Sequence, residues 1–95
     1  MMPKPSKGRI VLFVLPDGNL KGTTRPAIVT VTAADNGWES ADGVSGYKPE
    51  DEVVQLHVFL DGRNDAQHGY QPWYTSVKHD EGKAPGTWHW PPRVA

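Results

Sequence analysis

The chain of 95 residues contains no cysteine. Disulfide bonds and thiolate metal sites are therefore excluded, and the lack of cysteine fits a reducing cytoplasm, which is the location we expect. An excess of one charge is also missing, because ten Lys and Arg residues stand against eleven Asp and Glu residues. This balance argues against a nucleic-acid binder held by a basic surface, since affinity for phosphates needs clustered Lys and Arg.

Long hydrophobic runs are absent as well. The apolar run from Ile10 to Leu15 is too short for a membrane span, and no cleavage site of small residues follows it. We therefore expect neither a membrane segment nor a signal peptide. The length of the chain predicts one domain at residues 8–95, preceded by a flexible tail at residues 1–7.

Ten Gly and nine Pro residues interrupt the sequence, and this frequency excludes helices of ordinary length. The stretches between these breaks have the length and the branched residues of β-strands. The first predicted strand is a continuous apolar run and is expected to be buried on both faces. In the second, Ile28, Thr30 and Thr32 should share one face. The five predicted strands are residues 8–15, 27–32, 53–60, 73–78 and 87–90.

Five short strands cannot form a flat sheet that stays soluble, because one face and both edges would be exposed. Curling into a small barrel removes much of that exposure. The sequence therefore predicts an all-β fold, a small five-stranded SH3-like or OB-like half-open barrel with long loops.

The carboxy-terminal stretch contains two tryptophans around a histidine. Alternation along a strand places Trp88 and Trp90 on one face and His89 on the other. Two interpretations stay open: the tryptophans complete a small core, or they form the wall of a binding site. Pro91 and Pro92 follow, and because proline donates no hydrogen bond to a sheet, this strand should lie at an edge or at the end of the chain.

Two long loops are candidates for a site. Residues 33–50 carry Trp38 and Tyr47, which either hold the loop on the barrel or reach for a partner. Residues 61–72 are rich in hydrogen-bonding groups, which indicates either ordinary turns or a site for a polar ligand. The polar candidates in this second loop are Arg63, Asn64, Asp65, His68 and Tyr70.

The first third of the chain resembles the PemK/MazF family, SH3-like barrels that cleave RNA as toxins. The likeness rests on Gly8-Arg9-Ile10-Val11 and on Arg25-Pro26-Ala27-Ile28-Val29, after a loop of similar length. It implies that Arg25 contributes to RNA cleavage by stabilising charge that develops on a phosphate. The chain departs from the family at Arg9, where an acidic residue is usual, and after the third strand, where residues 61–65 replace the family's hydroxyl-bearing segment.

A second resemblance covers most of the chain. The segments "FLDGRND" and "WYTSVKHDEGKAPGTWHWP" resemble small uncharacterised proteins of tailed phages and prophages. This likeness implies a genetic setting and the cytoplasm of a host cell, without an activity. Phage proteins of this size often bind a host protein, a nucleotide messenger or a partner in the virion.

We therefore expect a non-enzymatic binding protein that recognises a nucleotide-like ligand or a host protein, with sequestration as a counter-defence role. The histidines lack the spacing of metal ligands, and the sequence predicts neither a metal nor a cofactor. One alternative is a ribonuclease that uses Arg25 on RNA, and another is an assembly module that pairs into a homodimer. The predicted ligand-binding residues are Arg25, Arg63, Asn64, Trp73, Tyr74, Trp88 and His89.

Overall fold

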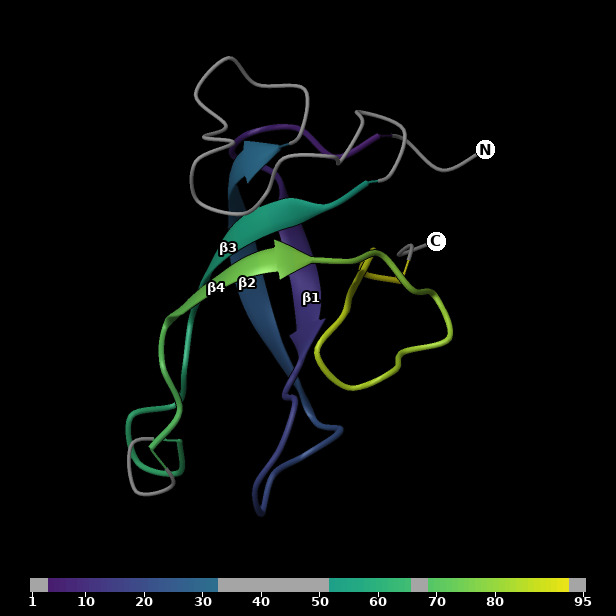
Figure 1. The fold of residues 1–95 in the computed structure, drawn as a ribbon. Coiled ribbons are helices and arrows are strands. Elements are labelled where there is room, and N and C mark those ends of the chain that lie inside the picture. Colours follow the sequence, from purple (N-terminus) through teal and green to yellow (C-terminus); the bar gives the residue numbers. More distant parts are fainter. Residues whose placement is uncertain (1–3, 33–51, 66–68, 93–95) are drawn as a thin grey trace.

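Five strands in one antiparallel sheet make up the fold, in a computed structural model that describes residues 4–32, 52–65 and 69–92 (Figure 1). The sheet order is β4-β3-β2-β1-β5, and the three described ranges contain no helix, so none that could cross a membrane. The predicted all-β, five-stranded fold is confirmed. The strands are β1 (Ile10–Val14), β2 (Thr24–Thr32), β3 (Val54–Val58), β4 (Trp73–Val77) and β5 (Trp88–His89).

The sheet curls into a half-open barrel, as predicted from the five short strands. Figure 1 shows β3 and β4 crossing over β1 and β2 rather than lying in one plane with them. The stretch that follows β4 then meets β5 from its other side. There the backbone N–H of Trp88 donates to the carbonyl of Lys78, and the N–H of Asp80 donates to the carbonyl of Trp88, both at 2.9 Å. These bonds link the two ends of the curled sheet.

The interior is lined by alternate residues of the strands, and this side is called the inner face below. Trp88 is fully buried, and Trp90 is 8% exposed and meets it edge to face, with ring centroids 5.2 Å apart. Both belong to the core, which confirms the first of the two interpretations of the tryptophans. As expected, β5 is the last strand in the sheet order, although the stretch after β4 also bonds to its other side. The buried core comprises Val11, Phe13, Leu15, Ala27, Val29, Val54, Leu56, Val58, Val77, Trp88 and Trp90.

The prediction for the first strand is wrong at its start, where Ile10 is 58% exposed. Val14, on the same side of β1, is fully buried, and its backbone exchanges hydrogen bonds with Thr87 and Gly86. The side of β1 that carries Ile10 and Val14 is therefore exposed at its first residue and buried at its last.

The second strand starts earlier than predicted and changes face near its end. It begins at Thr24, before Pro26, because the bonds to β1 come from alternate residues and do not need the missing N–H of proline. A bulge between Val29 and Val31 then shifts the register against β3. As a result Thr32 is buried while Thr30 is exposed, so the predicted sharing of one face by these residues is wrong.

Candidate functional site

The predicted site residue Arg25 forms an ion pair inside the open end of the barrel. It extends from β2 opposite Phe13, on the inner face. Its Nε and Nη2 atoms each donate a hydrogen bond of 2.7 Å to one oxygen of Asp65, whose side chain is fully buried. The hydrogen bonds to Asp65 raise the pKa of Arg25, although burial acts in the opposite direction. The remaining nitrogen, Nη1, donates to the carbonyl of Thr24 at 2.8 Å.

Asp65 is held in place by the turn that contains it. The backbone N–H of Asp61 donates to the Asp65 carboxylate at 2.6 Å, and the N–H of Asp65 returns a bond to the Asp61 carbonyl. The Asp61 carboxylate accepts bonds from the backbone N–H of Arg63 and from the side-chain amide of Asn64. The interpretation of this segment as turn chemistry is thus confirmed for Asp61 and Asn64.

Tyr70 joins this turn to the loop between β1 and β2. Its hydroxyl donates to the carbonyl of Asp17 and accepts a bond of 3.1 Å from the N–H of Leu20. Its own N–H donates to the carbonyl of Asp65. Gly18, with φ of 78°, brings the backbone close enough for this contact, because an added Cβ would lie 2.9 Å from the Tyr70 hydroxyl.

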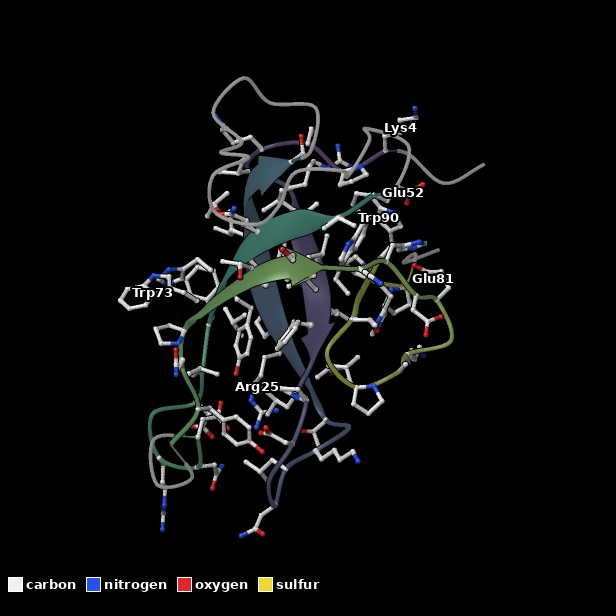
Figure 2. All side chains as sticks on the ribbon, viewed as in Figure 1. Lys4, Arg25, Glu52, Trp73, Glu81 and Trp90 are labelled. Atoms are coloured by element: carbon white, nitrogen blue, oxygen red, sulfur yellow. The ribbon has the colours of Figure 1, made fainter. Side chains whose placement is uncertain are left out.

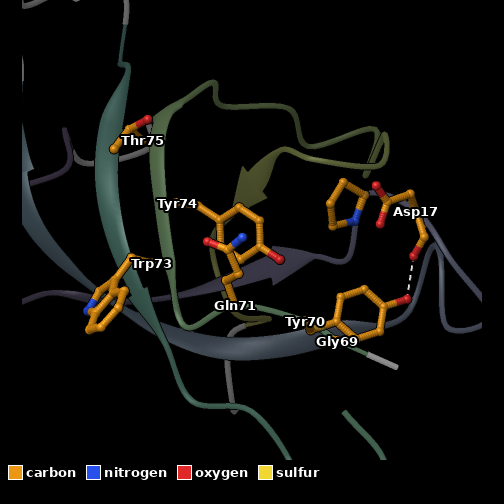
Figure 3. A pocket seen from close by; sticks show the side chains of 8 residues that line it. Asp17, Gly69, Tyr70, Gln71, Trp73, Tyr74 and Thr75 are labelled. Carbon is orange, nitrogen blue, oxygen red and sulfur yellow. Dashed lines mark hydrogen bonds between the residues drawn. The ribbon is translucent and has the colours of Figure 1, made fainter. Parts of the chain in front are cut away.

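A cleft of about 370 Å³ opens between these two loops and the start of β4 (Figure 3). Tyr74 faces inward and packs against Phe13, with ring centroids 4.4 Å apart. Burial raises the pKa of Tyr74, although a hydrogen bond with the backbone of Gln71 partly offsets that effect. Figure 3 shows the Trp73 ring on the other side of the strand from Tyr74. The cleft is lined by Pro16, Asp17, Gly69, Tyr70, Gln71, Trp73, Tyr74 and Thr75.

The cleft lining carries a negative charge. Asp17 is exposed and is the one lining residue with a formal charge. Arg25 lies on a neighbouring strand, but its guanidinium is engaged by Asp65 and by the Thr24 carbonyl. The described lining therefore offers a carboxylate and tyrosine rings, and no cation for a phosphate.

The seven predicted site residues fall into three places. Tyr74 and Trp73 line the cleft, and Arg25 lies beside the turn that carries the exposed Arg63 and Asn64. Trp88 and His89, by contrast, are 0% and 3% exposed, so neither presents a surface to a ligand. Sequence reasoning did not assign Asp17 to the site. The turn signal Pro16-Asp17-Gly18 located it in a loop, but no local pattern connects that loop with Tyr70.

A second polar cluster lies apart from the cleft and joins the carboxy-terminal strand to the barrel. Figure 2 shows Glu52, Glu81 and Trp90 together, away from Arg25 and Trp73. One oxygen of Glu81 accepts a bond of 2.9 Å from the backbone N–H of Trp90 and lies 2.6 Å from Nε2 of His79. The other ring nitrogen of His79 lies 3.4 Å from Glu52.

The contacts of Glu81 shift its pKa. Burial acts to raise the pKa of Glu81, but the Trp90 and His79 bonds outweigh it, so the pKa lies below its ordinary value. Burial lowers the pKa of His89. In the three described ranges no group of three His, Asp or Glu side chains is placed to hold a metal ion.

Comparison with protein families, curated proteins and solved structures found no match for this chain. Two of the sequence predictions lie outside the described residues: the candidate loop at residues 33–50, with Trp38 and Tyr47, and the candidate polar residue His68. The resemblances to the PemK/MazF family and to phage proteins stay predictions.

Proposed function

We propose that this chain is a non-enzymatic binding protein whose cleft takes an arginine side chain of a partner protein. The observation that carries the proposal is the Asp17 carboxylate at the edge of a cleft whose walls include the rings of Tyr70 and Tyr74. A guanidinium group can pair with a carboxylate and also stack on an aromatic face. The volume of about 370 Å³ lies within the range of small-ligand pockets.

A nucleotide ligand has less support than a protein partner. Cationic side chains strengthen phosphate binding, and the lining described here supplies none. Arg25 could serve only if it left a buried carboxylate, and removing one partner of a buried pair costs about 3 to 5 kcal/mol. Arg63 is exposed on its turn, but it is not part of the lining.

The ribonuclease hypothesis meets the same obstacle. A catalytic arginine must face the phosphate whose charge it stabilises. In this structure two nitrogens of Arg25 face Asp65 and the third donates to Thr24. We therefore propose a structural role for Arg25. Within the phage setting that the sequence suggests, a binding protein of this kind would act by sequestering a host protein.

The test is calorimetric titration with a short peptide that is blocked at both ends and contains one arginine. Its control is the same peptide with citrulline, which has the shape of arginine without the charge. We expect the arginine peptide to bind and the citrulline peptide to bind about tenfold more weakly or not at all. Asp17→Asn should remove this difference, while Arg63→Ala, a change at an exposed residue outside the lining, should preserve it.

Two further titrations separate the alternatives. A panel of linear and cyclic nucleotides that binds to the wild type and not to Arg63→Ala would favour a nucleotide ligand over our proposal. Cleavage of RNA that disappears in Arg25→Ala would establish the enzyme and overturn the proposal. Equal binding of the arginine and citrulline peptides would overturn it as well.

A further inference from the structure

Strand β4 stands at one end of the sheet order, and the cleft runs along its free edge. Within the described ranges β4 pairs with β3 on one side and with no strand on the other. The cleft is lined by Trp73, Tyr74 and Thr75, three consecutive residues of β4. Successive side chains of a strand point to opposite faces, so one cleft can touch all three only along the edge of the strand.

The hydrogen bonds between β3 and β4 show which backbone groups of β4 are already paired. The N–H of Val58 donates to the carbonyl of Pro72, just before β4, at 2.7 Å. Hydrogen-bonded pairs recur at every second residue of an antiparallel ladder, and the next pair joins Leu56 and Tyr74. The carbonyl of Pro72 and both backbone groups of Tyr74 therefore point toward β3.

The backbone groups between them point away from β3. In a trans peptide the carbonyl of one residue and the N–H of the next point in opposite directions. Both backbone groups of Trp73 and the N–H of Thr75 therefore point to the free edge, where such groups can pair with another strand. The pairing with β3 is bulged after Tyr74, and Ser76 has φ of 53°, so the regular part of this edge is short.

We propose that the partner of the cleft adds to this edge as a short antiparallel strand, with its arginine opposite Tyr74. The inference rests on the proposed function and names the backbone conformation in which the partner binds. Directly opposed residues lie on the same face of a sheet, so this arginine stands on the inner face beside the Tyr74 ring. Asp17 lines the same cleft and can pair with the guanidinium. Antiparallel pairing continues the arrangement of the sheet and is slightly more stable per residue than parallel pairing.

Every group of the free edge finds a partner in this arrangement. The peptide residue after the arginine lies opposite Trp73, donates its N–H to the Trp73 carbonyl and accepts a bond from the Trp73 N–H. The carbonyl of the residue before the arginine accepts a bond from the N–H of Thr75. The N–H of the arginine itself points away from β4. The main-chain bonds therefore come from the two neighbours of the arginine, while the arginine side chain enters the cleft.

The neighbours of the arginine meet a different surface. They project from the opposite face of β4, where the Trp73 side chain is 67% exposed. Aromatic and β-branched side chains that oppose each other across two strands stabilise the pairing. We therefore expect the partner segment to carry Val, Ile or Thr directly after the arginine.

Calorimetric titration with a blocked peptide that carries Val-Arg-Val at its centre tests the proposal. N-methylation of the valine after the arginine removes the N–H that bonds to Trp73 and should weaken binding about tenfold or more. N-methylation of the arginine is the matched control, because that N–H points away from β4, and it should change the affinity less than about twofold. Thr75→Pro removes an edge N–H without removing a bond to β3 and should weaken binding as well, whereas Arg63→Ala should not.

The outcomes separate this inference from the proposed function. An arginine peptide that binds better than its citrulline control, but is affected equally by the two methyl groups, would overturn the added strand and leave the arginine cleft standing. Loss of binding on methylation of the arginine alone would overturn the antiparallel pairing. An unmodified peptide that does not bind would overturn both proposals. The methylated peptides are titrated into the wild type, so the test does not depend on the folding of Thr75→Pro.

Hydrogen exchange of the backbone amides gives a second readout. We expect the amides of Trp73 and Thr75 to exchange rapidly in the free protein and slowly in the complex with the unmodified peptide. The amide of Tyr74, which is paired with β3, should be protected in both. Unchanged exchange at Trp73 and Thr75 in a saturated complex would contradict the added strand.

Discussion

Two parallel hydrogen bonds of 2.7 Å join the guanidinium of Arg25 to the fully buried carboxylate of Asp65, forty residues further along the chain. This pair connects a central strand to the turn from which Tyr70 reaches the loop at Asp17. The cleft therefore has its shape because the ion pair fixes one of its walls. In this account Arg25 supports the cleft without touching its ligand.

Removing one partner of this pair should destabilise the protein strongly. We expect Asp65→Ala to lower the free energy of unfolding by about 3 kcal/mol, because Arg25 loses its partner in a largely buried position. The double variant Arg25→Met, Asp65→Leu should recover most of that loss, since neither residue then leaves a charge buried. Urea unfolding measures both values. A single variant within about 0.5 kcal/mol of the wild type would contradict a structural role for the pair.

The two glycines of the loop between β1 and β2 offer a matched comparison. Gly18 and Gly22 have φ of 78° and 89°, so alanine is strained at both positions. Space for a Cβ exists at Gly22, whereas at Gly18 the Cβ would meet the Tyr70 hydroxyl, which two hydrogen bonds hold in place.

We expect Gly22→Ala to cost about 1 kcal/mol and Gly18→Ala about 2 kcal/mol of unfolding free energy. Adding Tyr70→Phe, which removes the obstructing oxygen, should cost less in the Gly18→Ala background than in the wild type. Chemical denaturation of the four proteins checks this coupling. Equal costs for the two alanine variants would show that the Tyr70 contact does not constrain the loop.

The tryptophans divide into a buried and an exposed set. Trp88 is fully buried and its indole N–H donates to the carbonyl of Glu52 at 2.9 Å, while Trp73 is 67% exposed. We expect Trp88→Ala to lower the unfolding free energy by about 4 kcal/mol, and Trp73→Ala to change it by less than about 0.5 kcal/mol in dilute protein. Thermal melts compare the two identical substitutions. Similar losses would argue against the carboxy-terminal strand as the closing element of the core.

Acid should destabilise the protein in two steps. Burial lowers the pKa of His89 in the folded state, so below its ordinary value of 6.5 the unfolded chain binds the proton more readily and stability falls. Glu81 also has a lowered pKa in the folded state, and its contribution is present above its ordinary value of 4.5 and lost as the pH falls through the folded-state pKa.

Unfolding free energies measured from neutral pH down to acid should therefore decrease as the pH falls below 6.5 and again below 4.5. His89→Gln should remove the first decrease, and Glu81→Gln should reduce the second. Stability that rises on acidification would reverse the assigned direction of both shifts.

The local features of the fold could be predicted from the sequence. Apolar runs between glycines and prolines located all five strands, because strand pairing and burial act on stretches of a few residues. The early start of β2 was missed, since Pro26 indicates a break unless the direction of its absent N–H is known. The bulge near Thr30 was also missed, because alternation assumes an unbroken register.

The candidate site was harder to predict because it depends on contacts between distant residues. Sequence named Arg25 and Asp65, but nothing local shows which acidic residue an arginine will meet. The bond between Tyr70 and Asp17 spans 53 residues. Trp88 and His89 were assigned to a ligand surface on their chemistry alone, and burial depends on how the barrel closes.

The most direct test of the central claim is a nuclear magnetic resonance titration of the labelled protein with the arginine peptide and its citrulline control. Our account predicts that resonances of Asp17, Tyr70 and Tyr74 shift with the arginine peptide and stay in place with the control. Those of the Arg25 guanidinium should keep the positions set by Asp65. Shifts that centre on Arg25, or that are the same for both peptides, would contradict it.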